Sequence, residues 1–144
     1  MKKIIFLFFL IFLPVFSFAS LELGVILGNP TGISGKYSNF QAGMGWDLTQ
    51  SFHLNVDYLF YNLSFSKLPL VFYVGGGGTM IVQSTKEKDA GNDSFRLGLR
   101  LPLGIFYQVK AVPLKIFFEV APAFYLIEST RAGIDWGLGV RYVF

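Results

Sequence analysis

The chain has 144 residues, with 12 basic and nine acidic side chains, and 53% of its residues are hydrophobic. Charged residues make up 15% of the chain, against about a quarter in an ordinary soluble domain. The absence of cysteine and the single histidine argue against a disulfide framework and a transition-metal site, and no basic cluster indicates nucleic-acid binding.

A signal peptide is predicted over residues 1–19. Two lysines follow the first residue, an apolar run covers 4–18, and a small-x-small cleavage pattern stands at 17–19. The run is about 15 residues long, short of the ~20 that a membrane-spanning helix needs, and Pro14 interrupts it. We therefore expect an exported, single-domain mature chain over residues 20–144.

The mature chain is predicted to form β-strands, because apolar and polar residues alternate with a period of two. In chain order, the predicted strands are 21–28, 31–38, 40–48, 52–61, 69–83, 95–108, 114–126 and 134–144. The first, second and fifth are weaker, and a bend or bulge is expected at the glycine run 75–78 in the fifth. Bulges are also expected at Pro102 and Pro122, because proline lacks the N–H that a sheet ladder uses.

Eight strands of about ten residues match the smallest closed outer-membrane barrels, so the predicted fold class is an all-β, antiparallel, eight-stranded transmembrane barrel. A barrel of this size has no room inside for the tryptophans, phenylalanines and leucines, which we expect to face lipid. In the five clear strands every charge falls on the other face, and Tyr61 shares that face. The predicted lumen charge network, with a structural role, comprises Asp47, Asp57, Arg96, Arg100, Lys115, Glu119, Asp135 and Arg141. Glu22 and Lys36 are expected to join it, and paired charges would leave no open pore.

An exported chain with eight strands has both ends on the periplasmic side, which directs the connection 84–93 outward. Within this polar loop the candidate surface contacts are Lys86, Glu87, Lys88 and Asp89. Trp46 and Trp136 fall near the outer strand ends, where aromatic belts meet the membrane interface. Phe144 closes an alternating stripe that resembles the sorting signal read by the barrel-assembly machinery.

The whole mature chain resembles the small outer-membrane barrels of the OmpA/OmpX architecture. It is similar, more closely, to a family of small uncharacterised outer-membrane barrel proteins best known from spirochaetes. The segments that carry this resemblance are Gly28–Tyr37, Asp57–Phe60, Arg100–Gly104, Phe118–Pro122 and Gly137–Phe144. The resemblance implies a bacterial outer-membrane location and a barrel architecture, and it implies no chemistry.

Three functions are compatible with these observations. The leading one is a monomeric, non-enzymatic surface or envelope protein without a cofactor, which contacts outer-membrane lipid and adheres to or binds host or environmental proteins through short loops. The second is a lipid A-modifying acyl hydrolase or acyltransferase that uses His53, with Ser51 and Asp47 nearby in sequence. The third is a narrow pore, which would require an open lumen.

Overall fold

The computed structural model describes residues 21–47, 50–83, 94–127 and 130–144. Two sequence predictions lie outside these ranges: the signal peptide at 1–19 and the loop contacts Lys86, Glu87, Lys88 and Asp89. Both stay predictions. The described ranges contain no helix with the length and apolar character needed to span a membrane.

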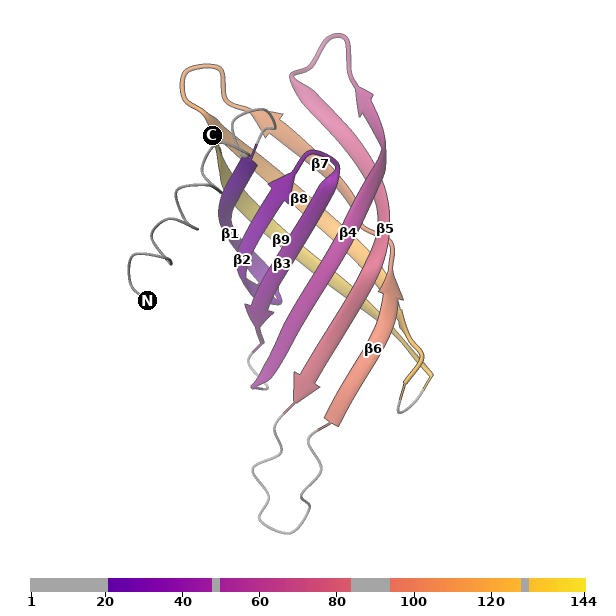
Figure 1. Ribbon diagram of the computed structural model, residues 1–144. Coiled ribbons are helices and arrows are strands. Elements are labelled where there is room, and N and C mark those ends of the chain that lie inside the picture. Colours follow the sequence, from indigo (N-terminus) through magenta and orange to yellow (C-terminus); the bar gives the residue numbers. More distant parts are fainter. Residues whose placement is uncertain (1–20, 48–49, 84–93, 128–129) are drawn as a thin grey trace, which may run out of the picture.

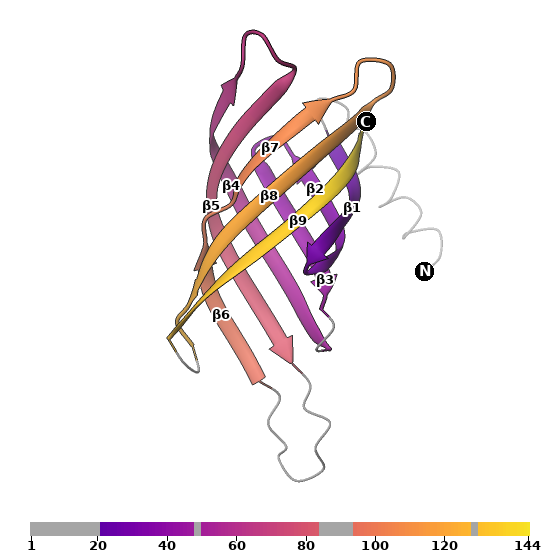
Figure 2. The ribbon, with the colours of Figure 1, turned by 180° about the vertical axis from the view of Figure 1, so that it is seen from behind.

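The described residues form a closed antiparallel barrel (Figures 1 and 2). Its strands are β1 (Leu21–Asn29), β2 (Thr31–Tyr37), β3 (Phe40–Trp46), β4 (Ser51–Ser64), β5 (Leu70–Gln83), β6 (Ser94–Arg100), β7 (Leu103–Gln108), β8 (Leu114–Tyr125) and β9 (Arg131–Val143). Neighbours along the chain pair with one another except β6 and β7, which each pair with β5 and β8, and β1 pairs with β9 to close the sheet. Because β6 and β7 both lie between β5 and β8, they share one position, and the predicted eight-stranded barrel is confirmed.

The barrel has two distinct ends (Figure 1). We call one the terminal end, because β1 starts there and the chain finishes there, with the Phe144 N–H donating to the Leu21 carbonyl at 2.9 Å. The turns after β2, β4 and β7 lie at the same end. We call the opposite end the mouth end; β1, β3, β5 and β8 finish there.

The predicted bulges at Pro102 and Pro122 are wrong. The pairs that flank the interruption between β6 and β7 are Gly77–Arg100 and Val74–Leu103 with β5, and Arg100–Ala123 and Leu103–Val120 with β8. Between the flanking pairs, the residue number changes by three on both strands, so neither strand has an inserted residue. The two sides of the break therefore keep one register.

The interruption instead follows from missing hydrogen-bond donors. The Leu101 N–H donates to the Pro122 carbonyl at 2.9 Å, and the Gly75 N–H donates to the Pro102 carbonyl at 2.9 Å. In an antiparallel ladder such pairs return a second bond, which proline cannot donate. Both prolines thus lie at the same interruption of the sheet. Each accepts one hydrogen bond from its paired residue but cannot donate the second.

A bulge does occur opposite the glycine run, where a bend or bulge was expected. Leu59 pairs with Gly75 and Tyr61 with Val74, so Phe60 is the extra residue on β4. Beyond it the alternation of buried and exposed residues on β4 is lost. The prediction that Tyr61 lies on the inner face is consequently wrong, since its side chain is 50% exposed.

Period-two alternation sorts the remaining side chains into an inner and an outer set. The buried interior contains charged groups from many strands, together with rings such as Tyr73 and Phe117. The rings fit because glycines face them: a Cβ on Gly104 would lie 2.3 Å from the Tyr73 ring, and one on Gly139 would lie 2.3 Å from the Phe117 ring. Large apolar side chains cover the outside, the reverse of an ordinary soluble protein.

Candidate functional site

The middle of the barrel contains an acidic cluster built around one guanidinium. Arg100 Nε lies 3.2 Å from Asp57 Oδ1, Arg100 Nη1 lies 3.4 Å from Asp135 Oδ2, and Arg100 Nη2 donates to Glu119 Oε1. The Arg100–Asp57 contact lacks hydrogen-bond geometry and is therefore purely electrostatic. Tyr73 adds a hydrogen bond of 2.7 Å to Glu119 Oε2. Three carboxylates and one arginine give this central acidic cluster a formal charge of −2.

A basic cluster of opposite charge lies nearer the terminal end. Glu22 accepts a hydrogen bond from Lys115, and its carboxylate lies 3.6 Å from Lys36 Nζ and 3.9 Å from Arg141 Nη1. The Arg141 guanidinium also stacks on Phe117, 3.9 Å from the ring centroid. Three cations and one carboxylate give this terminal basic cluster a formal charge of +2, so the two clusters neutralise each other.

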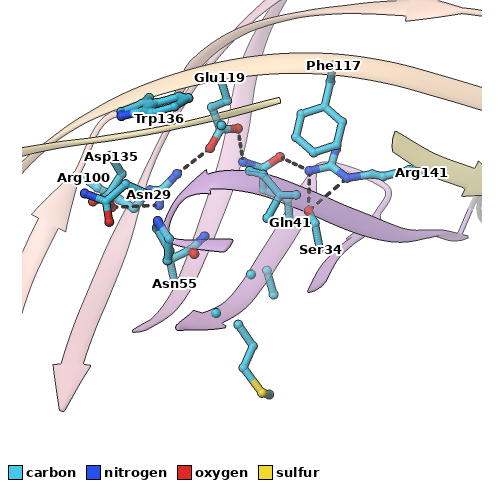
Figure 3. A pocket seen from close by; sticks show the side chains of 17 residues that line it. Asn29, Ser34, Gln41, Asn55, Arg100, Phe117, Glu119, Asp135, Trp136 and Arg141 are labelled. Carbon is cyan, nitrogen blue, oxygen red and sulfur yellow. Dashed lines mark hydrogen bonds and ion pairs between the residues drawn. The ribbon is translucent and has the colours of Figure 1, made fainter. Parts of the chain in front are cut away.

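Gln41 joins the two clusters (Figure 3). Its amide nitrogen donates to Glu119 Oε2 at 2.7 Å and to Asp57 Oδ2 at 3.2 Å. Its amide oxygen accepts from Arg141 Nη2 at 3.3 Å, while the same guanidinium donates to Ser34 Oγ at 2.7 Å. An amide is suited to this position because it can donate to carboxylates and accept from a guanidinium at the same time.

Very little open space remains between these side chains. The cavity that both clusters line has a volume of about 30 Å³, which is room for a water molecule and little more. Buried charges are tolerated when each finds a partner, and here each cluster supplies them. The interior is therefore arranged as a filled, hydrogen-bonded core.

A second group of polar residues lies at the mouth end. His53 is 5% exposed, and its Nε2 lies 3.2 Å from Asp47 Oδ2. The Ser51 N–H donates to Asp47 Oδ1 at 3.0 Å. Among the described residues, the buried His53 Nδ1 has no hydrogen-bond partner, so it contacts none of their hydroxyls as a general base would have to. The three residues of the predicted lipid-modifying site are thus close together, but the proton-transfer contact is not assembled.

Arg96 departs from its predicted pairing with a carboxylate. Its Nη2 donates to Gln83 Oε1 at 3.0 Å, and within the described part of the chain it has no ion pair. The nearby carboxylates of Asp47 and Asp135 are held by His53 and Arg100 respectively. The other predicted lumen charges lie in ion pairs, except Asp47, whose carboxylate lies 3.2 Å from His53 Nε2.

Sequence reasoning missed the uncharged members of the interior network. Ser34 and Gln41 are on the inner face that alternation defines, so a search of that face for amides and hydroxyls would have found them. Tyr73 was inaccessible to such a search because the facing of β5 was uncertain around its glycines.

Comparisons with known proteins agree with this architecture. A family model described as "Protein of unknown function (DUF3996)" matches residues 17–144. No curated protein matches the chain significantly. The N-terminal β-barrel domain of Pseudomonas aeruginosa OprF has a similar structure, with a TM-score of 0.64 and 16% identity over 88% of this chain and 96% of that one. Neisserial surface protein A (NspA) gives a TM-score of 0.56 and 16% identity over 88% and 94%. At this identity the likeness shows the fold alone.

Proposed function

This chain belongs to the family described as "Protein of unknown function (DUF3996)", and we propose that it is a non-enzymatic, monomeric protein of the bacterial outer membrane. In this proposal the barrel is an anchor, and the loops at its mouth end contact molecules outside the cell. The observation that carries the proposal is the apolar exterior of a closed barrel with a filled interior.

The exterior has the chemistry of a lipid-facing surface. Outward residues such as Leu99, Ile134 and Leu138 are 62%, 64% and 52% exposed, and similar side chains lie on the strands around the barrel. A soluble monomer rarely exposes an apolar area of this extent. Among charged residues of the described strands, Arg131 alone is exposed, and it is the first residue of β9 at the mouth end. Closure also satisfies the backbone groups that hydrocarbon cannot.

Aromatic side chains at both ends support a membrane-spanning orientation. Trp46 and Phe52 pack edge to face at the mouth end, with ring centroids 5.6 Å apart. Tyr142 and Phe144 do the same at the terminal end, at 4.9 Å. Amphipathic rings favour the two membrane interfaces. Phe144 is also the residue that we propose the barrel-assembly machinery reads during insertion.

The shared end of the two described termini supports the predicted orientation. A chain exported to the periplasm and inserted from there keeps both ends on that side, which turns the mouth end outward. The connection between β5 and β6 then faces the exterior with Lys86, Glu87, Lys88 and Asp89, which we propose as contacts for host or environmental proteins.

Trypsin treatment of intact cells tests this orientation. Cleavage is expected after Lys86 or Lys88, whereas Lys110, in the turn after β7 at the terminal end, is protected until the outer membrane is permeabilised. Mass spectrometry of the fragments identifies the sites, and a Lys86→Gln/Lys88→Gln variant is the control. Cleavage at Lys110 in intact cells would contradict the orientation.

The same treated cells test the contact function. If loop 84–93 carries it, cells shaved by trypsin lose the bound serum or environmental protein that untreated wild-type cells retain. Cells of the Lys86→Gln/Lys88→Gln variant lack these two cleavage sites and show how much binding depends on those two charges. Equal binding by shaved and untreated cells would contradict a contact through this loop.

The filled interior predicts that the barrel does not conduct ions. Planar-bilayer recordings of the refolded protein are expected to show no discrete channel steps, because the cavity of about 30 Å³ offers no continuous water path. The N-terminal barrel domain of OprF, refolded by the same protocol, provides a structurally similar comparison. Regular unitary steps from the wild-type chain would favour the pore.

A further inference from the structure

The hairpin of β4 and β5 has an open sheet edge at the terminal end. β3 pairs with β4 only up to Tyr58, and the Leu59 N–H donates to the Asn39 carbonyl in the turn before β3 at 2.7 Å. β5 continues to pair with β4 as far as Ser64. Figure 1 shows this hairpin extending past the turn between β2 and β3. Residues 60–64 therefore have β5 on one side and no described strand on the other, over about 16 Å.

Main-chain groups point out of this edge at alternate residues. The Phe65 N–H donates to the Leu70 carbonyl at the start of β5, at 3.2 Å. Alternate residues of a strand direct their N–H and C=O to opposite neighbours, so those of Ser64 and Asn62 point to the open edge. Unpaired backbone groups are not tolerated in hydrocarbon, so this edge belongs beyond the membrane, on the periplasmic side in the proposed orientation.

The side chains along this edge are apolar and exposed. Past the bulge, Tyr61, Leu63 and Phe65 follow one another at a spacing of two and are 50%, 43% and 46% exposed. Proteins commonly protect an exposed edge with proline or with charged side chains, and residues 60–66 contain neither. An apolar edge of this kind is suited to accept one further strand.

A second copy in the same membrane cannot supply that strand in the more stable, antiparallel direction. β4 runs toward the terminal end, and it does so in every copy inserted the same way. Barrel strands are tilted by ~35–45° from the membrane normal, so the β4 strands of two such copies stay within about 90° of each other. An antiparallel neighbour has to run away from the terminal end, and it therefore comes from a different molecule.

We propose that this edge binds an extended, acidic and apolar peptide segment of a periplasmic protein, as an additional antiparallel strand beside β4. The periplasmic placement rests on the proposed function. Lys67, in the turn after β4, is the one charged residue between 58 and 83, and it is exposed. An antiparallel segment starts beside this turn, so a carboxylate near the start of the segment meets the Lys67 ammonium. The apolar residues that follow lie beside Leu63 and Tyr61.

The peptide acetyl-Asp-Val-Thr-Val-Thr-Val-amide tests this edge on barrels in phosphatidylcholine nanodiscs, which leave both ends of the barrel open to solvent. In the proposed register its threonines exchange hydrogen bonds with Ser64 and Asn62, and its valines lie beside the exposed apolar side chains. Fluorescence anisotropy of the dye-labelled peptide is expected to show saturable binding. N-methylation of both threonines should abolish this binding. N-methylation of the valines is the matched control and should leave it intact, because their N–H groups point away from β4.

Variants of the barrel test the same register. Asn62→Pro should weaken binding by about tenfold, because proline removes an outward donor and its ring fills the edge, while the bonds to β5 are kept. Lys67→Gln should weaken binding by a smaller factor, and Lys110→Gln, in the turn after β7, should leave it unchanged. Heat-modifiable gel mobility verifies that each variant is folded. In hydrogen exchange followed by NMR, the peptide should slow the Asn62 and Ser64 amides and leave the Leu63 amide, which faces β5, unchanged.

The proposal is overturned if the wild-type barrel does not bind the peptide, or if a folded Asn62→Pro protein binds it equally well. Barrel dimers that form in vesicles with the wild type and not with Asn62→Pro would assign the edge to a second copy and overturn it too. The orientation is tested separately: labelled peptide should bind cells, above the level of cells that lack the protein, only after the outer membrane is permeabilised. Peptide that binds in nanodiscs and also labels intact cells would contradict the orientation while supporting the edge pairing.

Discussion

Replacing Arg100 with methionine is expected to lower the free energy of unfolding by about 3–5 kcal/mol. Arg100 is 7% exposed, and of the cations in the described ranges it is the one that forms ion pairs with Asp57, Glu119 and Asp135. Methionine has a similar length and no charge, so the cost is that of three buried carboxylates left without a counter-charge, rather than that of an empty space.

Urea titration of the folded barrel in phosphatidylcholine vesicles, followed by tryptophan fluorescence, measures this loss. Lys110→Met, which removes a charge from an exposed turn residue, is the matched control and should change stability by no more than about 0.5 kcal/mol. Adding Glu119→Gln to Arg100→Met should recover part of the loss, because one uncompensated charge is removed. A loss below about 1 kcal/mol would show that the cluster is hydrated and not a closed network.

Replacing Leu138 with arginine is expected to destabilise the barrel in a bilayer by about 2–4 kcal/mol, the cost of a charge on the lipid face near the midplane. Leu138 lies in the middle of β9 and is 52% exposed. Leu68, in the turn between β4 and β5, is 57% exposed and is the matched control. Its replacement by arginine should cost about 0–1 kcal/mol, because it lies outside the hydrocarbon.

Comparing the two leucine substitutions shows whether the exterior of the barrel faces lipid or water. If the exterior faced water, both substitutions would place arginine on an equally exposed surface and would have similarly small effects. Unfolding free energies in vesicles, measured side by side, decide between these cases. Equal values for Leu138→Arg and Leu68→Arg would refute the lipid-facing exterior.

Much of this fold could be predicted from the sequence, because a barrel strand has only two faces. Alternation in residues 134–144 places Leu138 outside and Asp135 and Arg141 inside, and the structure has all three as predicted. A charge on the apolar face would be costly, so the positions of charged residues mark the facing of each clear strand. The same reasoning yields eight strand positions and the location of buried charge.

The partners inside the barrel could not be predicted in the same way. Arg100 and Glu119 lie on adjacent strands, so their contact is a local one. Gln41 and Glu119 instead meet across the lumen, and that contact depends on how far the strands are staggered around the barrel. The bulge at Phe60 changes the stagger, and no pattern in the sequence of β4 predicts that bulge. The bulges at the prolines were also predicted wrongly, because the prediction treated each proline alone. Pro102 lies between β6 and β7, next to β8 with Pro122, so the two missing donors coincide at one interruption of the hydrogen-bond ladder.

The separation of charge between the central acidic cluster and the terminal basic cluster makes the interior resemble a bipolar junction. A cation that enters from the mouth end first meets a formal charge of −2 and then one of +2; an anion from the other end meets the reverse. Ions of either sign are thus first attracted and then repelled. Should mutations widen this core enough to admit water, the two fields in series would make the leak rectify, passing current more readily under one polarity of voltage than the other.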